Sequence, residues 1–372
     1  MQKLSIIFSD IEFGAGTPTD DFVEDDLLIS TIDSLIPWTK KYPTDFIFNG
    51  DTFDFLKVPY RGRYIRHITE RNSLWKLARI RNVHPQFFPL LKKILKADPR
   101  TRIIFIHGNH DFDLEFPGVQ KQIQRYISKT DHDRILFTGF TFSDGLLEVE
   151  HGSQLDPFCK VVPHRFVHQP RTHPSREPYL LVPWCHNVLC EHYFHIKEKY
   201  PLLERLFPRA RTLELLPLDL KRKVLIDTLF YLFKTFTYTQ FRYNKDRLYR
   251  LNLRELRKYI LFWIRGEYEI RIDKQARRQL RKRPYKVLSY GHNHRGKLLY
   301  ANGKWVLNTG SWRDEYILIE EAQKYVPKLK SYGFVLHDEK KVHKIKLYHV
   351  KSRQKPIPIT EIKAYIKQVE YQ

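Results

Sequence analysis

Five short motifs in the sequence combine carboxylate, amide or imidazole side chains with glycine or a second carboxylate. They are Asp10-Ile11-Glu12, Gly50-Asp51-Thr52-Phe53-Asp54, Gly108-Asn109-His110-Asp111, His151-Gly152 and Gly291-His292-Asn293-His294. Oxygen and imidazole donors of this kind suit divalent ions such as Mn, Fe or Zn. A carboxylate that bridges two such ions about 3.5–4 Å apart supports an in-line displacement at phosphorus. The motifs therefore indicate metal-dependent chemistry on a phosphate group.

The motifs follow runs of residues that are typical of buried strands. Strands are expected at residues 5–8, 45–49, 102–107, 146–151 and 286–290, and helices at 24–41 and 85–97. This alternation predicts an α/β sheet, and the later strands, which lack intervening helices, are expected to be antiparallel. Ligands gather outside the carboxyl ends of strands in such sheets, so we expect the motifs to converge on one site.

The composition sets limits on the class of protein. Hydrophobic residues make up 42% of the 372 residues, which is enough for a sizeable core and excludes a wholly disordered chain. No uncharged apolar stretch is long enough for an ordinary transmembrane helix. The three cysteines (Cys159, Cys185 and Cys190) do not suggest a disulfide framework, and the first residues do not resemble a signal peptide. We therefore expect a cytoplasmic protein.

The positive charge of the chain is concentrated in its middle. The chain carries a net charge of +23, and residues 160–286 hold 29 Lys and Arg against 12 Asp and Glu, a net +17. Such an excess favours a polyanionic partner, which can be a phosphorylated substrate, an anionic membrane surface or nucleic acid. Residues 158–283 are also rich in aromatic side chains and are expected to be mostly helical.

The domain organisation follows from this change of pattern. We expect a discontinuous core formed by residues 1–157 and 284–350, a helical basic and aromatic insertion at 158–283, and a tail at 351–372. Both ends of the insertion border site motifs, so the insertion is expected to cap the site. Within it, residues 224–241 are nearly apolar. The favoured interpretation is a helix buried against the core, and the alternatives are a lipid-contacting face or a dimer seam.

The motif set resembles the calcineurin-like metallophosphoesterases, whose pattern is D-x-H, G-D-x-x-D, G-N-H-D, H and G-H-x-H. The resemblance covers the chain outside the insertion. It implies a four-layer α/β/β/α sandwich and a hydrolase with two divalent ions, Mn first, with Fe, Zn or Mg as alternatives. It also implies metal ligands in two groups that share Asp51: Asp10, Asp51 and His294, and Asp51, Asn109, His151 and His292.

The same resemblance implies the catalytic roles. A metal-bridging hydroxide is the expected nucleophile, and His110, oriented by Asp111, is expected beside the scissile phosphate. Glu12 departs from the pattern, because the family has histidine there. Its carboxylate either completes the first metal site, which favours Mn or Mg, or points away from it; both interpretations stay open.

The substrate is not determined by these motifs. The architecture resembles UDP-2,3-diacylglucosamine pyrophosphatases, although those enzymes commonly have Arg in place of His110 and much shorter insertions. This suggests hydrolysis of a phosphoester or pyrophosphate bond in an anionic lipid or nucleotide-lipid, with peripheral contact at the inner membrane face. A nucleotide or nucleic-acid phosphodiesterase is the alternative. A catalytically weak, metal-bound scaffold is a hypothesis of a different class, and only Glu12 supports it.

Overall fold

The computed structural model describes residues 1–169, 177–249, 257 and 268–370. A six-stranded sheet holds the first site motifs and has the order β16-β15-β1-β2-β3-β4. Its parallel strands are β1 (Lys3–Phe8), β2 (Thr44–Asn49), β3 (Arg102–Ile106) and β4 (Ile135–Phe137). The strands β15 (Lys330–His337) and β16 (Val342–Val350) extend the sheet in antiparallel fashion. The carboxyl ends of β1, β2 and β3 therefore lie side by side.

A second, five-stranded sheet holds the remaining motifs. Its order is β11 (Lys297–Ala301), β12 (Lys304–Asn308), β10 (Val287–Tyr290), β6 (Leu147–Glu150) and β5 (Thr141–Ser143). Strands β6, β10 and β12 are parallel, and β5 and β11 pair with them in antiparallel fashion. This arrangement brings the ends of β6 and β10, and hence His151 and His292, to the same edge.

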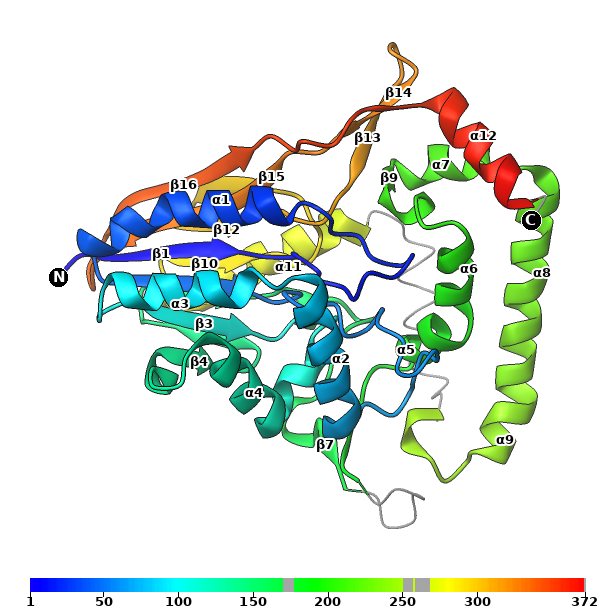
Figure 1. Ribbon diagram of the computed structural model, residues 1–372, viewed down its shortest axis with the longest axis horizontal. Coiled ribbons are helices and arrows are strands. Elements are labelled where there is room, and N and C mark those ends of the chain that lie inside the picture. Colours follow the sequence, from blue (N-terminus) through cyan, green and yellow to red (C-terminus); the bar gives the residue numbers. More distant parts are fainter. Residues whose placement is uncertain (170–176, 250–256, 258–267, 371–372) are drawn as a thin grey trace.

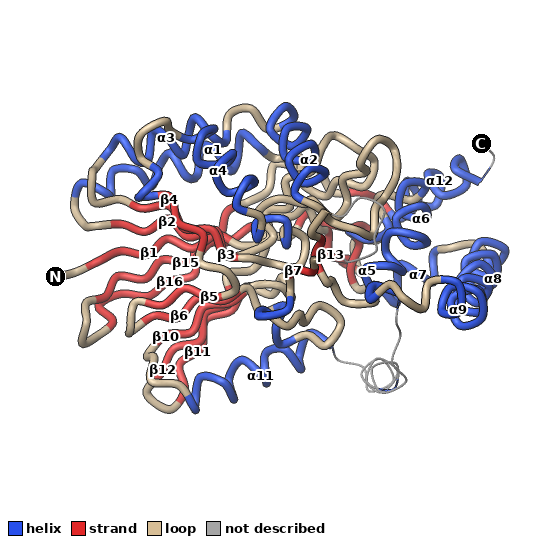
Figure 2. The backbone as a smooth tube through the Cα atoms, turned by 90° about the horizontal axis from the view of Figure 1, so that it is seen from below, coloured by secondary structure: helices blue, strands red, loops and turns tan. Residues whose placement is uncertain are grey.

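The two sheets pack face to face between two layers of helices (Figure 2). Alternation along β1 places Ile6 in the core shared with α1 (Asp25–Leu35), α2 (Glu70–Val83), α3 (Phe87–Ala97) and α4 (Pro117–Ile127). The next residue, Ile7, packs between the sheets with Val149 and Leu307. On the far side, Ile272 of α11 (Tyr268–Lys282) packs against the second sheet. The fold is thus the predicted α/β/β/α sandwich.

Helix α11 differs from the expected domain boundary. Its residues lie inside the range 158–283 assigned to the insertion, yet Ile272, Ala276 and Leu280 form one cluster with Leu288 and Val306 of the sheet. The chain therefore rejoins the core before residue 284. The sequence of α11 is strongly basic on its outer face, and this composition hid its membership of the core.

The insertion lies beyond the carboxyl ends of the parallel strands (Figure 1). Its described helices are α5 (Cys185–Val188), α6 (Phe194–Lys199), α7 (Arg209–Leu215), α8 (Leu218–Lys234) and α9 (Gln240–Arg242). Strands β7 (Val167–His168) and β8 (Tyr179–Leu180) form a short antiparallel pair, and β8 also contacts the core through Ile68 and Thr69. Among the described residues, no helix combines the length and the apolar character needed to cross a membrane.

The tail is joined to the insertion rather than to the main sheets. A small sheet has the order β17 (Ile357–Pro358), β14 (Lys324–Pro327), β13 (Tyr316–Ile319) and β9 (Leu206–Phe207), so it combines tail, core and insertion. After β17, Ile362 of α12 (Ile359–Glu370) packs with Tyr200 and Leu216 of the insertion. The tail therefore holds the insertion in place from the outside.

Helix α8 contradicts the favoured interpretation of residues 224–241. Its large apolar side chains do not pack against the core: Leu225 is 59% exposed, Phe230 is 68% exposed and Phe233 is 65% exposed. A nearly apolar segment does not reveal from its sequence alone which of its sides faces the protein. In the fold, α8 forms the outer edge of the insertion (Figure 1).

Candidate metal centre

The backbone of the site is strained at five positions. Asp10, Glu12, Asp51, His292 and His294 have φ angles between 49° and 69°, and they account for five of the eight described non-glycine residues with positive φ. This left-handed conformation is unfavourable for residues with a Cβ, and it concentrates at functional sites where the surrounding structure enforces it. The turns after β1, β2 and β10 therefore redirect these side chains toward a common site.

Close backbone approaches explain two of the glycines. A Cβ on Gly108 would collide with the carboxylate of Asp51, and a Cβ on Gly50, which has a φ of 74°, would overlap the His151 ring. Only glycine therefore fits at these two positions while the ligands keep their places.

The segment that follows β12 fixes the position of Asp10. The Asp10 carbonyl oxygen accepts hydrogen bonds from the backbone N–H groups of Trp312 and Arg313, both at 2.9 Å, and from Ser311 Oγ at 3.2 Å. Trp312 itself is fully buried and packs on Phe8, with 5.7 Å between ring centroids. These hydrogen bonds from the segment thus hold the backbone of Asp10 in place.

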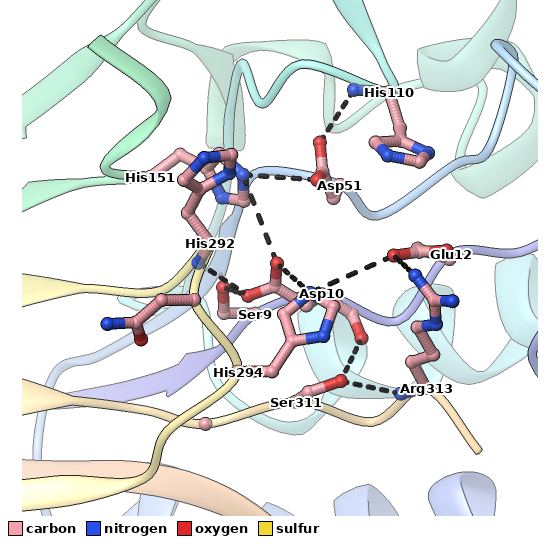
Figure 3. A network of polar contacts seen from close by, with 12 residues as sticks. Ser9, Asp10, Glu12, Asp51, His110, His151, His292, His294, Ser311 and Arg313 are labelled. Atoms are coloured by element: carbon pink, nitrogen blue, oxygen red, sulfur yellow. Dashed lines mark hydrogen bonds and ion pairs between the residues drawn. The ribbon is translucent and has the colours of Figure 1, made fainter. Parts of the chain in front are cut away.

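His151 presents one ring nitrogen to a group of oxygen atoms (Figure 3). Its Nδ1 lies 3.0 Å from the Asn49 carbonyl oxygen, which only an Nδ1–H can satisfy. Its Nε2 lies 3.1 Å from Asp51 Oδ2 and 3.3 Å from Asn109 Oδ1. In the neutral ring Nε2 carries a lone pair. Nε2 and the Asp51 and Asn109 oxygen atoms then surround a position that suits a cation.

His294 repeats this arrangement on the other side of Asp10. Its Nδ1 lies 2.5 Å from Glu315 Oε1, and its Nε2 lies 3.1 Å from Asp10 Oδ1. Asp10 Oδ1 is buried and, apart from His294 Nε2, has no hydrogen-bond partner among the described residues. It also lies 3.9 Å from His151 Nε2. A carboxylate–histidine pair directed at a second carboxylate is the supporting arrangement of many metal sites.

His292 links the two groups. Its backbone N–H donates to Asp10 Oδ2 at 3.1 Å, and its Nε2 lies 3.0 Å from Asp156 Oδ2. Asp51, His151 and His292 offer ligand atoms that all lie within 4.8 Å of one another. Asp156 was not among the predicted site residues, although it stands in the segment that leads from His151 into the insertion.

The buried carboxylates of the site favour a positive charge beside them. Burial lowers the pKa of His151, but Asp51 and Asp10 outweigh burial and raise it to about 10. In the same way, Glu315 and Asp10 outweigh burial and raise the pKa of His294 to about 10. The carboxylates thus hold a cation at these rings, either a proton or a metal ion. The oxygen and imidazole donor set, with Asp10 Oδ1 beside His294 Nε2, fits a divalent ion.

His110 is oriented by a different carboxylate from the one predicted. Its Nδ1 lies 2.9 Å from Asp54 Oδ1, and its backbone N–H donates to Asp51 Oδ1 at 2.7 Å. Asp111 instead accepts from the backbone N–H groups of Thr52 at 2.8 Å and Gly108 at 2.6 Å. The expected orientation of His110 by Asp111 is therefore corrected. Asp111 holds the two loops together, and Asp54 positions the imidazole.

The position of His110 suits a proton donor. Its side chain is 14% exposed, while that of Asp54 is fully buried. Burial lowers the pKa of His110, but Asp54, Asp51 and Glu12 outweigh it and raise this pKa to about 9. The ring therefore carries a positive charge at neutral pH and keeps its Nε2 side for another partner.

Glu12 is paired with cations of the protein. Its Oε2 lies 2.5 Å from Lys57 Nζ, and its Oε1 lies 3.3 Å from Arg313 Nη1 and 3.9 Å from His294 Nε2. Burial raises the pKa of Glu12, but Arg313 and Lys57 outweigh it and hold the pKa well below its usual range. Ligand atoms of Glu12, Asp54 and His110 also lie within 4.8 Å of one another. Its carboxylate thus borders the site, and metal ligation by Glu12 stays a prediction.

Comparison with known proteins identifies the family. The family model described as calcineurin-like phosphoesterase matches residues 20–209, just over half of the chain. The chain belongs to the calcineurin-like phosphoesterases. It is therefore a phosphoester hydrolase that depends on divalent metal ions. Comparison with curated protein sequences gives no match.

Solved structures that resemble this phosphoesterase are remote in sequence. One is an archaeal phosphodiesterase with 11% identity and a TM-score of 0.30, over 93% of this chain and 99% of the other. Another is a conserved protein from Streptococcus pneumoniae TIGR4, described as a phosphoesterase, with 10% identity and a TM-score of 0.31, over 96% of both chains.

The sequence-based prediction missed the buried ion pairs of this phosphoesterase. Lys57 Nζ lies 2.6 Å from Asp21 Oδ2 and 2.9 Å from Asp54 Oδ2 in addition to Glu12. Arg313 Nη2 lies 3.1 Å from both Asp21 Oδ2 and Glu204 Oε1. These side chains come from distant parts of the chain and belong to common residue types, so no local motif indicates the ion pairs that they form.

The insertion contributes directly to this network. Lys197 of α6 pairs with Asp21 and with Glu204, and the side chain of Lys197 is almost completely buried. Burial and repulsion by Lys57 and Arg313 lower the pKa of Lys197, although Asp21 and Glu204 oppose this. A continuous chain of ion pairs thus connects α6 to Glu12 at the edge of the metal centre.

Proposed function

We propose that the protein hydrolyses phosphoester or pyrophosphate bonds with two divalent ions, Mn²⁺ foremost. The observation that carries this proposal is the convergence of ligand atoms: His151 Nε2 and His294 Nε2 lie among oxygen atoms of Asp51, Asn109 and Asp10, where the carboxylates favour a cation, either a proton or a metal ion. Two groups of acceptors that share a small volume accommodate two cations more naturally than one.

The proposed ligands divide into two sets. Asp10, Asp51 and His294 would hold one ion, and Asp51, Asn109, His151 and His292 would hold the other. When bound, the ions activate water and neutralise charge on the phosphoryl oxygens. Glu315 and the Asn49 carbonyl support this role, because they fix His294 and His151 with Nε2 directed into the site.

His110 has the second role in the proposed reaction. Its ring is positively charged and partly exposed, so it can stabilise the phosphoryl oxygens or give its Nε2 proton to the leaving group. Asp54 holds Nδ1 and keeps the ring in this orientation. The Asp111 carboxylate has no contact of this kind with His110. It accepts hydrogen bonds from the Thr52 and Gly108 backbone and so holds the two loops together.

We further propose an anionic lipid or nucleotide-lipid as the substrate. Support comes from the insertion, which joins the site through Lys197 and carries exposed apolar side chains on its outer helix. A substrate with a phosphate group and an acyl part would match both features. Hydrolysis of nucleotides or nucleic acids is an outcome of the same test, since the metal centre is common to all these substrates.

The experiment is a substrate panel with a matched pair of variants. Purified protein with Mn²⁺ is assayed on phosphomonoesters, phosphodiesters and pyrophosphate-linked nucleotide-lipids, and bound metal is counted by mass spectrometry. Asp51→Asn should lose both turnover and metal. The control is Asp45→Asn, because Asp45 lies at the start of β2, the strand that precedes Asp51, and pairs with Lys3 and Arg102. Turnover by Asp51→Asn at the wild-type level, or none by wild type with Mn, Fe, Zn or Mg, would overturn the proposal.

A further inference from the structure

Helix α8, the π-helical turn that follows it (Thr235–Thr239) and the short helix α9 carry apolar side chains on the outside. Exposed fractions between 42% and 82% belong to seven large residues: Leu225, Ile226, Leu229, Phe230, Phe233, Phe236 and Phe241. Most are spaced three or four residues apart, so they share one side of the helix. A helix at a protein–water boundary normally has the reverse arrangement.

The inward side of the same helix is comparatively polar. Tyr231, Thr235 and Thr239 are buried there. The Thr228 hydroxyl donates to the Val224 carbonyl at 2.7 Å, and the Thr235 hydroxyl donates to the Tyr231 carbonyl at 2.8 Å. These threonines satisfy their own hydrogen bonds within the helix, so they can face the protein without an external partner.

Specific contacts fix the rotation of α8. His192 of the insertion lies parallel to the Tyr231 ring, with 5.5 Å between centroids, and its Nε2 lies 2.9 Å from Thr228 Oγ1. The apolar side is therefore held outward by contacts on the opposite side. A group of large exposed apolar side chains on one side of a helix marks an interaction site.

The charges around the apolar side indicate the partner. Residues 221–245 contain six basic residues and one acidic residue, Asp227. Lys221, Arg222 and Lys223 lie at one end, Lys234 lies in the middle, and Arg242 and Lys245 lie at the other end. Within the described part of the chain, no ion pair involves Arg222, Lys223 or Lys234. An apolar side with basic residues around it is typical of helices that lie in the surface of an anionic membrane.

The same charges argue against a second copy of the chain as the partner. In a symmetric dimer the same surface meets itself, which would bring the basic groups of both copies together around the apolar contact. An anionic phospholipid surface satisfies both features at once: acyl chains cover the phenylalanines, and headgroup phosphates pair with the lysines and arginines. Tyr238 and Tyr243, 55% and 42% exposed, are residue types enriched at such interfaces.

We propose that the outer side of α8 and its following turn docks the protein on anionic phospholipid membranes. Docking on a membrane requires no catalytic step, so this proposal is tested independently of the proposed hydrolysis. It would bring the insertion, whose α6 lies beside α8 (Figure 1), to the membrane surface, and Lys197 of α6 belongs to the ion pairs that lead to the metal centre.

Vesicle co-sedimentation tests the proposal with the full chain. One set of vesicles contains phosphatidylcholine and phosphatidylglycerol, and the other contains phosphatidylcholine alone. Wild type should bind the anionic set in a salt-sensitive manner. Phe230→Ser with Phe233→Ser should weaken binding at least about tenfold, because each phenylalanine loses its apolar contact. Both side chains are exposed, so folding should be unaffected.

Matched variants separate the causes. Tyr300→Ser removes an equally exposed aromatic residue (61%) on β11 and should bind as wild type does. Arg222→Glu with Lys223→Glu should weaken binding to anionic vesicles. Asp51→Asn should bind normally, so a failed hydrolysis assay leaves the docking result readable. The proposal is overturned if wild type ignores anionic vesicles, if the phenylalanine variant binds as tightly as wild type, or if sedimentation velocity shows a dimer that this variant dissociates without any vesicle binding.

Discussion

The contact between Asp54 and His110 leads to the sharpest prediction about the reaction. His110 Nδ1 lies 2.9 Å from Asp54 Oδ1, and carboxylates led by Asp54 outweigh burial and raise the pKa of His110 to about 9. Relative to an ordinary histidine pKa of about 6.5, this corresponds to about 3 kcal/mol in favour of the charged ring. Asp54→Asn removes the nearest negative charge. We expect the pKa of His110 to fall by at least about one unit, or about 1.4 kcal/mol.

The direction of the pH effect follows from the raised pKa. The folded-state pKa of His110 lies above its ordinary value, so the charged ring is present below about pH 9 and is lost as the pH rises through that value. If the reaction needs this proton, kcat of the wild type falls on the basic side as His110 loses it, and bound Mn²⁺, which offsets the charge of Asp51, moves this fall below the metal-free value. In Asp54→Asn the fall begins at least about one unit lower.

The assay is kcat as a function of pH with saturating Mn²⁺ on a phosphodiester with an alkoxide leaving group, which requires a proton. Asp111→Asn is the matched control, because Asp111 bonds to the Thr52 and Gly108 backbone rather than to His110. Asp111→Asn should lower Tm, and its kcat should begin to fall at the same basic pH as that of the wild type. The assignment of Asp54 as the positioning residue would be refuted if kcat of Asp54→Asn began to fall at the same basic pH as that of the wild type. It would also be refuted if kcat of Asp111→Asn began to fall at a lower pH.

Three further predictions concern the surroundings of the metal centre. Glu315→Gln should weaken metal binding about 10- to 100-fold in a competition titration, because His294 loses the carboxylate that holds its Nδ1. Glu12→Gln should lower the free energy of unfolding by about 3 kcal/mol in urea denaturation, because Lys57 and Arg313 lose a buried counter-charge. The metal content of the same variant decides the open question: its loss makes Glu12 a ligand, and unchanged content excludes Glu12 as a ligand. Lys197→Met should speed proteolysis of the insertion, whereas Lys199→Met, at an exposed position of the same helix, should not.

Local sequence signals predicted the sheet and the site because both depend on neighbouring residues. A buried run such as that before Asp51 forms a strand, and a glycine after it permits the sharp turn that the ligand needs. The ends of parallel strands meet at one edge, so Asp10, Asp51 and Asn109 converge whatever the details of packing. The alternation of strands and helices predicted an α/β sheet, and the resemblance to the family implied its four-layer arrangement.

Contacts between distant residues were beyond this reasoning. Asp54 and Asp111 are both carboxylates near His110 in the sequence, and only the folded loops show that Asp54 is the one that reaches Nδ1. Helix α8 shows the same limit, since a segment that is apolar on most sides gives no preferred orientation. His192 and Tyr231 settle its rotation, and they are 39 residues apart in the sequence.

The glutamate at position 12 is best understood together with the cations around it. A neutral histidine there would leave Lys57 and Arg313 without one of their buried counter-charges, and burial makes such a loss costly. The two cations in turn reach Asp21 and Glu204, which also pair with Lys197 of the insertion. Glu12 therefore belongs to the ion pairs that fasten the insertion to the core, in addition to bordering the metal centre. Restoring histidine alone would disturb the attachment of the insertion, so the departure from the family pattern does not by itself indicate a weakened enzyme.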